Sequence, residues 1–352
     1  MESLVDRLKS TYSGRRVLVT GHNGFKGSWL VALLEFLGAE VHGISLELGE
    51  NSPFRNFHKN SRCVSHVVDI RDFESLKSRI EEICPEIVFH LAAQSLVLES
   101  YENPRETFEV NVQGTANLLE SLDHTSFLGI IAATTDKVYS NDNSGRIFCE
   151  SDELWGYDPY SLSKTGTELA ISAWRNLPKG KSRAYITVRA GNVFGPGDRG
   201  KHRLLPDLLE SIRSDSIVEI RSPESVRPWQ YVLDPLIGYL FVGLKVLNTQ
   251  KVSTAYNFGP SHESFLSVIE FVKKLQEIKN FQFNITEADL TLESKILKID
   301  SSLAAEELGW RSTTTLVEGL NYAVSLDSPQ IEPNLCLDHV EEYLTRTQNS
   351  LM

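Results

Sequence analysis

The chain has 352 residues with 41% hydrophobic content, which is enough for a large buried core in one large domain or two modest ones. Its formal net charge of −12 at pH 7 argues against a nucleic-acid-binding surface, although a local basic pocket for an anionic ligand is compatible with it. The four cysteines show no CxxC spacing, so we expect neither a metal site nor a disulfide framework. The amino-terminal residues do not resemble a signal peptide and no apolar run reaches about 18 residues, so we expect a cytoplasmic protein without a membrane span.

Short apolar runs alternate with helical patterns through the first half of the chain. The alternation predicts an α/β fold with a doubly wound parallel sheet of the Rossmann type, whose ligands bind at the carboxyl ends of the strands. The expected strands are Val17 to Thr20, Val41 to Ser45, Val64 to Asp69, Ile87 to Leu91, Ile130 to Thr134 and Tyr185 to Val188. The expected helices are Ser28 to Leu37, Phe73 to Ile83, Arg105 to Leu122 and Pro159 to Trp174.

The pattern becomes irregular beyond Gly195, where short helical stretches are separated by segments rich in proline and arginine. We therefore assign residues 1–190 to a dinucleotide-binding domain, to which later segments can return. Residues 191–330 form mainly a smaller substrate-binding region. Residues 331–352 are expected to be a carboxyl-terminal surface appendage, although their apolar spacing also allows a docking helix.

A glycine-rich turn, GHNGFKG, lies between the first expected strand and the first expected helix. In this context the backbone amides at the start of the helix face a pyrophosphate, and the missing glycine side chains permit its close approach. A purely structural helix-capping turn is the alternative. The dinucleotide interpretation assigns cofactor binding to Gly21, Asn23, Gly24, Phe25, Lys26 and Gly27.

Tyr160 and Lys164 form the only YxxxK pattern in the chain, and they follow a turn that ends at Pro159. Residues four apart lie on one face of a helix, so the ammonium can sit beside the phenol and lower its pKa toward the working pH. The phenolate would then act as a base. A tyrosine at an interface above a solvated lysine is the alternative.

Three further groups of residues stand where the strands of such a sheet end. Asp69 ends the third strand, with Ile70 next to it, and Asp69 either bonds an adenine amine or caps the next helix; the sequence leaves both roles open. Thr135, Asp136 and Lys137 place a hydroxyl, a carboxylate and an amine at the same edge, unless they are solvated loop residues. Small residues that let the backbone approach a cofactor occur in the run Leu91, Ala92, Ala93, Gln94.

From about Arg16 to about Ser325 the chain resembles the extended short-chain dehydrogenases/reductases and, among these, the CDP-glucose group of the nucleotide-sugar 4,6-dehydratases. The lysine after TTD and the string RPWQ separate this group from relatives that act on dTDP-glucose or GDP-mannose. The resemblance is carried by VTGHNGFKGSWL, DIRDFESL, PEIVFHLAAQSLV, ETFEVNVQGTANLLE, TTDKVY, DPYSLSK, VRAGNVFGPGD, RLLPD, VRPWQYVLDPLIGYL, YNFGP and LGW.

The resemblance implies a catalytic role for Thr135, Tyr160 and Lys164 as a Ser/Thr-Tyr-Lys triad, with Asn111 supporting the proton relay beside the cofactor. Asp136 is implied as the acid for the departing 6-hydroxyl. Lys137 stands where the dTDP-glucose relatives carry a glutamate base. The implied reaction turns CDP-glucose into its 4-keto-6-deoxy product by transient oxidation at C4, for deoxysugar biosynthesis such as that of lipopolysaccharide O-antigens.

NAD is the cofactor that the resemblance implies. The strand expected to end at Ser45 has no acidic residue at its tip to bind the ribose 2′-hydroxyl, so NAD is favoured over NADP by the resemblance alone. The resemblance also implies a homodimer formed through the expected helices 105–122 and 159–174.

The carboxyl-terminal half is expected to bind the nucleotide-sugar substrate. Arg203, next to Leu204, and Arg227 are candidates for clamping a diphosphate, because guanidinium matches phosphate oxygens bidentately. Arg221 either reaches the same nucleotide or only supports solubility, and Asn192 either contacts the sugar or phosphate or forms a turn.

Several positions depart from the group; among them, the group carries arginine in place of Leu98 and proline in place of Ser95. An epimerase or reductase on the same fold would share the glycine turn and the triad but would not need the Asp136 and Lys137 pair. A non-catalytic nucleotide-sugar-binding homologue is the other alternative.

Overall fold

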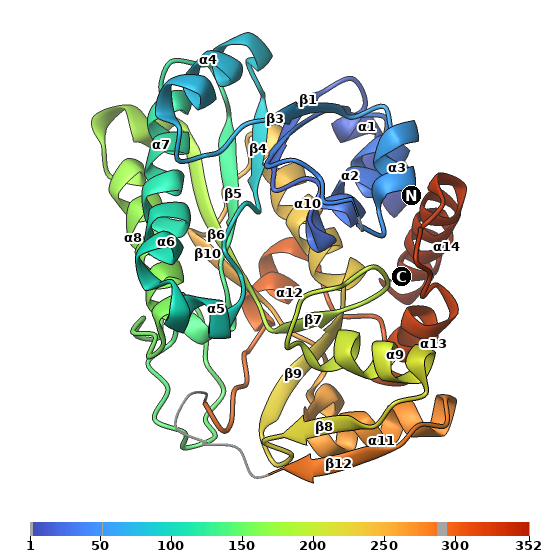
Figure 1. Cartoon of the computed structure of the whole chain (residues 1–352). Helices are drawn as coiled ribbons and strands as arrows, with labels where there is room; N and C mark the ends of the chain where they lie inside the picture. Colours follow the sequence, from blue (N-terminus) through green and yellow to red (C-terminus); the bar gives the residue numbers. More distant parts are fainter. Residues whose placement is uncertain (1–2, 51, 287–293, 352) are drawn as a thin grey trace.

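A seven-stranded parallel sheet organises the computed structural model, which describes residues 3–50, 52–286 and 294–351 (Figure 1). The strand order is β10-β6-β5-β4-β1-β2-β3, and every neighbouring pair is parallel. This is the doubly wound sheet that the sequence predicted. Its strands are β1 (Arg16–Thr20), β2 (Glu40–Ser45), β3 (Val64–Val67), β4 (Ile87–His90), β5 (Gly129–Ala133), β6 (Ala184–Ala190) and β10 (Ala255–Phe258).

Helices cover both faces of this sheet, and each face has its own apolar core (Figure 1). Side chains of the strands alternate between the faces, so that Leu18 packs toward one core while Val17 and Val19 pack toward the other. The first core includes residues of α4 (Phe73–Ile83), α7 (Gly114–Leu122) and α8 (Pro159–Arg175). The second includes residues of α1 (Leu4–Tyr12), α2 (Phe25–Phe36) and α10 (Leu233–Leu247).

The predicted elements of the first half agree with the structure apart from their ends. The helix expected at 105–122 is interrupted: α6 (Pro104–Phe108) leads into a π-helical segment, η1 (Glu109–Gln113), before α7 begins. The seventh strand, β10, and the core helix α10 come from the part of the chain after residue 190. The sheet therefore recruits segments from both halves of the sequence.

A second region lies beyond the carboxyl ends of the strands (Figure 1). It contains a three-stranded sheet of β7 (Asn192–Phe194), β9 (Val226–Tyr231) and β11 (Phe265–Ser267), and a two-stranded sheet of β8 (Val218–Arg221) and β12 (Phe283–Thr286). The helices α9 (Leu204–Ser214) and α11 (Val268–Ile278) pack on these strands. The remaining elements are α3 (Arg55–Asn60), α5 (Val97–Glu102), η2 (Asp136–Val138), η3 (Pro178–Ser182), η4 (His262–Ser264), α12 (Ser302–Leu308), α13 (Leu316–Ser325) and α14 (Pro333–Leu351).

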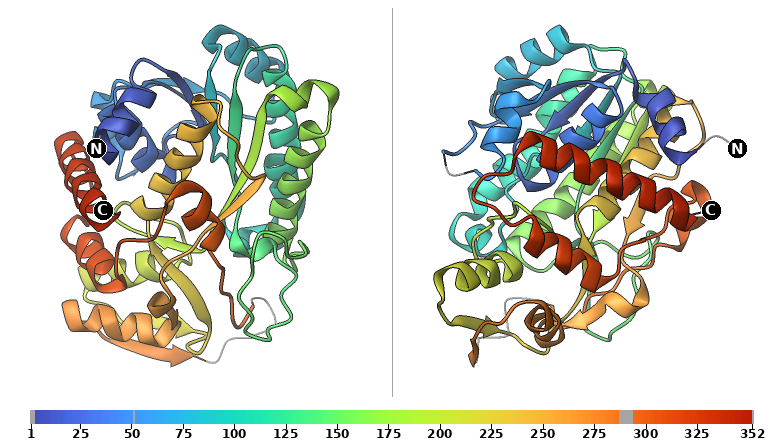
Figure 2. Two further views of the ribbon diagram at one scale, coloured as in Figure 1. Left: turned by 180° about the vertical axis from the view of Figure 1, so that it is seen from behind. Right: turned by 90° about the vertical axis from the view of Figure 1, so that its right-hand side faces the viewer.

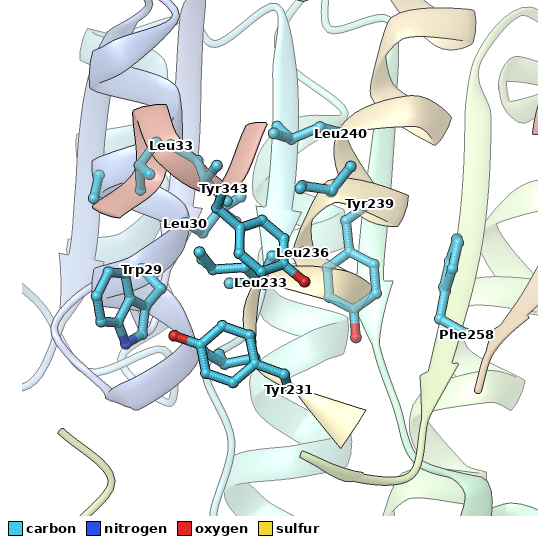
Figure 3. Packing of buried hydrophobic residues seen from close by; sticks show 14 of the residues in the cluster. Trp29, Leu30, Leu33, Tyr231, Leu233, Leu236, Tyr239, Leu240, Phe258 and Tyr343 are labelled. Carbon is cyan, nitrogen blue, oxygen red and sulfur yellow. The ribbon is translucent and has the colours of Figure 1, made fainter. Parts of the chain in front are cut away.

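The carboxyl-terminal residues form a docked helix rather than a surface appendage (Figure 2). α14 contacts α2, α3 and α1, because its apolar residues recur at helical spacing and face the core: Cys336, Val340, Tyr343 and Leu344 are buried. Figure 3 shows Tyr343 among residues of α2 and α10, and its ring centroid lies 5.6 Å from that of Tyr231. The Tyr343 hydroxyl donates to the Asp234 carboxylate at 2.8 Å, which satisfies a buried polar group of α10.

The chain order of the strands reverses between β1 and β4, because β1 is followed outward by β2 and β3 before the chain crosses to β4. In sheets of this kind ligands bind in the crevice at that switch point. In the part of the chain that the structure describes, no helix combines the length and the apolar character that crossing a membrane requires.

Candidate active site

A cavity of about 1230 Å³ opens at the carboxyl ends of the central strands. This volume exceeds the ~300–1,000 Å³ of ordinary ligand pockets and leaves room for two ligands. Its lining includes every site residue expected from the sequence except Asn111: Gly21, Asn23, Gly24, Phe25, Lys26, Gly27, Asp69, Ile70, Leu91, Ala92, Ala93, Gln94, Thr135, Asp136, Lys137, Tyr160, Lys164, Asn192, Arg203, Leu204, Arg221 and Arg227.

The glycine turn fits a dinucleotide because two of its glycines leave no room for a side chain. Gly21 has a φ of +70°, and a Cβ there would lie 2.7 Å from the Ala92 nitrogen. A Cβ on Gly27 would lie 2.0 Å from the Gly21 carbonyl oxygen, so the helix packs directly against the turn. α2 then begins at Phe25, with its first amides at the cavity wall. Asn23 fixes the turn to the end of β2 by donating from Nδ2 to the Leu46 carbonyl at 2.7 Å.

Asp69 does not cap the helix that follows it. The cap of α4 is Asp72, whose carboxylate accepts from the Ser75 amide. Asp69 instead lines the cavity and pairs with Arg71 at 2.6 Å, and hydrogen bonds from Arg71 lower the pKa of this carboxyl. The structure thus excludes the capping role, and the adenine-binding role stays a prediction.

Asn111 does not reach the cavity, which corrects its assignment as a cofactor-binding residue. It is buried in the π-helical segment, one layer behind the cavity wall. Its Oδ1 accepts from the Gln94 amide at 2.8 Å, and its Nδ2 donates to the Gln94 carbonyl at 2.9 Å and to the Ser163 hydroxyl at 2.8 Å. Asn111 thus holds the loop after β4 against α8.

The predicted triad is assembled at the end of β5. α8 begins at Pro159 after the capping residue Asp158, and its first turn carries the Tyr160 phenol to the Thr135 hydroxyl, with which it hydrogen-bonds. Lys164, one turn further along α8, donates from Nζ to the Ala133 carbonyl at 2.7 Å. Burial lowers the pKa of Lys164 to about 8.

The pKa of Tyr160 is not lowered in this structure, contrary to the expectation from the YxxxK spacing. Burial raises it to about 12, although the Arg203 charge and the Thr135 hydrogen bond act in the opposite direction. The Lys164 ammonium donates to the Ala133 carbonyl and is not among the main influences on the pKa of Tyr160. Helical spacing placed the two residues on one face but did not determine where the ammonium points.

Asp136 lies buried in the single turn η2, next to Thr135. Burial raises the pKa of its carboxyl to about 6, against the lowering effects of Lys137, of a hydrogen bond from Thr135 at 3.0 Å, and of Arg227 and Lys26. Its second oxygen, Oδ2, has no hydrogen-bond partner among the described residues. A carboxyl whose pKa is raised toward neutral and whose second oxygen is unpaired can act as a general acid.

Cationic side chains surround this carboxyl on the substrate side. Arg203 reaches across the cavity, donating to Asp198 at 3.2 Å and to the Ser95 hydroxyl at 3.0 Å. Arg227 is buried and donates to the Val226 carbonyl at 3.0 Å. Arg221 stands further out, where its Nη2 lies 3.5 Å from the His202 ring. These guanidinium groups suit a diphosphate.

Sequence reasoning did not assign Asp198, which orients Arg203. Asp198 is buried in the turn after Pro196 and also accepts from the Gly200 amide at 3.0 Å. The sequence feature that could have indicated this role is the position of Asp198, five residues before Arg203 and directly after a Gly-Pro-Gly turn. Ser95, a position that departs from the group, contacts the same guanidinium.

Comparison with known proteins identifies the family. Residues 17–259 match the model of the NAD dependent epimerase/dehydratase family. The chain belongs to that family. The CDP-glucose 4,6-dehydratase of Salmonella typhimurium is 41% identical over 327 residues, which cover 90% of this chain and 91% of that relative. The resemblance to the CDP-glucose group is therefore confirmed, and so is the expectation that the cofactor is NAD.

Solved structures agree on the fold. The UDP-glucose 4-epimerase of Thermus thermophilus, in complex with NAD, superposes with a TM-score of 0.77 at 25% identity, covering 88% of this chain and 98% of that chain. The dTDP-glucose 4,6-dehydratase DesIV of Streptomyces venezuelae superposes with a TM-score of 0.78 at 24% identity, covering 88% and 96% of the two chains. The Rossmann-like architecture is thus shared by dehydratases and epimerases.

Proposed function

We propose that this protein is a CDP-glucose 4,6-dehydratase, which removes one water from CDP-glucose and leaves a 4-keto-6-deoxy sugar. The observation that carries the proposal is Asp136: a buried carboxyl with a pKa raised to about 6 shares one cavity with Thr135, Tyr160 and Lys164. An epimerase needs the triad but not an additional acid. The 41% identical relative supports CDP-glucose as the substrate.

The chain's own groups divide the proton transfers between them. Tyr160, hydrogen-bonded to Thr135, accepts the proton of the sugar 4-hydroxyl as the phenolate, so its own proton has to leave the phenol first; Lys164 holds the Ala133 carbonyl and so fixes the end of β5. Bound NAD supplies the acceptor of the hydride from C4 and the source of the hydride that C6 receives at the end. The residues that would hold it are those of the glycine turn, with Asp69 and the Leu91 to Gln94 run.

Water loss is assigned to the two residues after Thr135. A ketone at C4 acidifies the hydrogen at C5, and Lys137, which lines the cavity, accepts that proton as the neutral amine, so its ammonium proton has to leave before this step. Asp136 donates its proton to the departing 6-hydroxyl through the oxygen Oδ2. Burial raises the pKa of Asp136 to about 6, so that the proton to be donated is present on a larger fraction of molecules than on an ordinary carboxyl.

We assign the nucleotide diphosphate to Arg203 and Arg227, because both guanidinium groups line the cavity and Arg227 acts electrostatically on Asp136. Arg221 and Asn192 line the same cavity, Leu204 adds an apolar contact beside Arg203, and all three remain proposed substrate contacts.

A homodimer in the cytoplasm is the expected form of the protein. α6 and α8, which pack together, each carry an exposed apolar side chain, Phe108 and Leu169. A second copy would cover these side chains through the helices that the family resemblance implied. The four cysteines are free thiols, which suits a reducing compartment.

The test is incubation of the purified protein and NAD with CDP-glucose, dTDP-glucose, GDP-mannose or UDP-glucose, followed by mass spectrometry. Loss of one water from CDP-glucose alone is the expected result. An isobaric product would favour an epimerase, and bound NAD with no turnover of any sugar nucleotide would favour a non-catalytic homologue. D136N then separates the roles: a dehydratase loses water elimination, whereas an epimerase keeps its activity.

A further inference from the structure

A buried ion pair lies directly behind the active site and does not line the cavity. Arg189 of β6 donates two hydrogen bonds to Glu168 of α8, from Nε to Oε1 at 2.8 Å and from Nη2 to Oε2 at 3.0 Å. Both side chains are buried. Burial raises the pKa of Glu168, but the charge and hydrogen bonds of Arg189 outweigh it, so that the pKa lies below its ordinary value and the carboxylate stays ionised.

The pair is tied to both ends of the segment that carries Thr135, Asp136 and Lys137. At its start, the Thr134 hydroxyl donates to Glu168 Oε1 at 2.6 Å. At its end, Arg189 Nη1 donates to the Tyr139 hydroxyl at 2.9 Å.

The end of the segment has further anchors. The Tyr139 hydroxyl donates to the Asn257 side chain at 2.6 Å, and the Tyr139 ring stacks on Phe148 with centroids 5.0 Å apart. The segment 134–139 is therefore held between two partners that bind each other. A shift of the pair would displace both ends of the segment together.

Glu168 also belongs to the catalytic face of α8. It stands one turn after Lys164 and two turns after Tyr160, and its charge acts on the Lys164 ammonium. The ion pair thus connects the helix that carries Tyr160 to the loop that carries Thr135 and Asp136.

We infer that Glu168 and Arg189 are positioning residues, which fix the segment 134–139 relative to α8 so that Thr135 and Asp136 meet Tyr160. This inference rests on the proposed function of the site. Their own removal is a poor test, because losing one partner would leave an unpaired buried charge and endanger folding. The links at Thr134 and Tyr139 can be cut without opening the pair.

T134V removes the hydroxyl that bonds to Glu168 and preserves the shape of the side chain. We expect kcat for water loss to fall about tenfold with KM nearly unchanged, because small misplacements of catalytic groups cost rate rather than binding. T134S keeps the hydroxyl and should restore kcat. The matched control is T125V: Thr125 is equally buried and donates to the Leu122 carbonyl at 3.0 Å, but lies before β5, at the opposite edge of the sheet.

Y139F cuts the second link, and the double variant T134V/Y139F should lower kcat further than either single change. Hydrogen–deuterium exchange of the amides in 134–139 provides a readout that does not depend on turnover. We expect faster exchange there in T134V and Y139F and unchanged exchange in T125V. The inference is overturned if T134V and T125V have the same kcat and the same exchange. A parent protein that dehydrates no sugar nucleotide would contradict the proposed function, while the exchange comparison would still decide the positioning.

Discussion

Lys26 of the glycine turn and Asp136 of the loop after β5 share one electrostatic environment although they are far apart in the chain. Burial lowers the pKa of Lys26 to about 8 and raises that of Asp136 to about 6, while each charge partly offsets the shift of the other. The glycine turn and the proposed acid therefore line the same cavity within electrostatic reach of each other. Burial disfavours the charged form of both side chains and so destabilises the folded state when they are ionised. Shifted pKa values of this kind are common among catalytic groups.

Removing the charge of Asp136 should stabilise the fold at neutral pH. Asp136 has a pKa of about 6 when folded and near 3.8 when unfolded, so the folded state binds the proton more tightly. The contribution of Asp136 to stability is then greatest below pH 4 and decreases by about 3 kcal/mol as the pH rises through 6. We expect D136N to be more stable than the parent by up to that amount at pH 7, with the difference vanishing near pH 4. Urea denaturation at several pH values measures it.

D142N is the matched control for this prediction. Asp142 is exposed, and hydrogen bonds from Ser144 lower the pKa of its carboxyl, so the sign of its effect is opposite. It should gain no stability at pH 7. A D136N protein that is less stable than the parent at pH 7, or equally different at all pH values, contradicts the burial argument.

Y160F tests the proposed base. The change removes the phenol oxygen that accepts the proton of the sugar hydroxyl and leaves the apolar packing of the ring. We expect kcat to fall by on the order of 10²–10⁴, with the affinity for NAD, followed by tryptophan fluorescence, within about twofold of the parent. Y157F is the control, because Tyr157 is 63% exposed and three positions away. Equal losses in both variants would assign the effect to the loop rather than to the phenol.

R203K tests the diphosphate clamp. Lysine keeps the charge but loses the fork that now spans Asp198 and Ser95, and a single ammonium cannot bind a phosphate bidentately. We expect KM for CDP-glucose and the inhibition constant of CDP to rise about tenfold or more, with a smaller effect on kcat. R213K serves as the control, since Arg213 pairs with Glu210 and Asp327 and does not line the cavity. A change in kcat alone would place Arg203 among the groups that act on chemistry.

The sheet and most of the site were predictable from the sequence because parallel strands are short, apolar and followed by polar residues at one edge. That rule found Asp136 and the Leu91 to Gln94 run without any knowledge of the long-range contacts. It failed for Asn111, whose helical position says nothing about which layer its side chain reaches. The expectation of a lowered pKa for Tyr160 was also wrong. The direction of the Lys164 side chain depends on its acceptor, the Ala133 carbonyl, which belongs to another element.

The carboxyl-terminal half was less predictable for a physical reason. Its short strands pair with partners distant in sequence, as β12 does with β8, and its helix α14 covers α2 from nearly the opposite end of the chain. The only local indication of such a contact is the periodic spacing of apolar residues, and this spacing fits both a docked helix and an amphipathic surface segment. The ion pair of Glu168 and Arg189 was invisible for the same reason, since neither residue stands in a motif that specifies its partner.

L169E tests the proposed dimer. Leu169 is 65% exposed on α8, on a helix that the dimer would bury, and a carboxylate there would have to lose its water without a partner. We expect a dimeric parent and a monomeric L169E protein in light scattering coupled to size-exclusion chromatography, with the thermal unfolding of each subunit little changed. I285E places the same charge on a side chain that is 57% exposed on β12, in the second region, and should leave the dimer intact. Dissociation by both variants, or by neither, would move the interface away from α8.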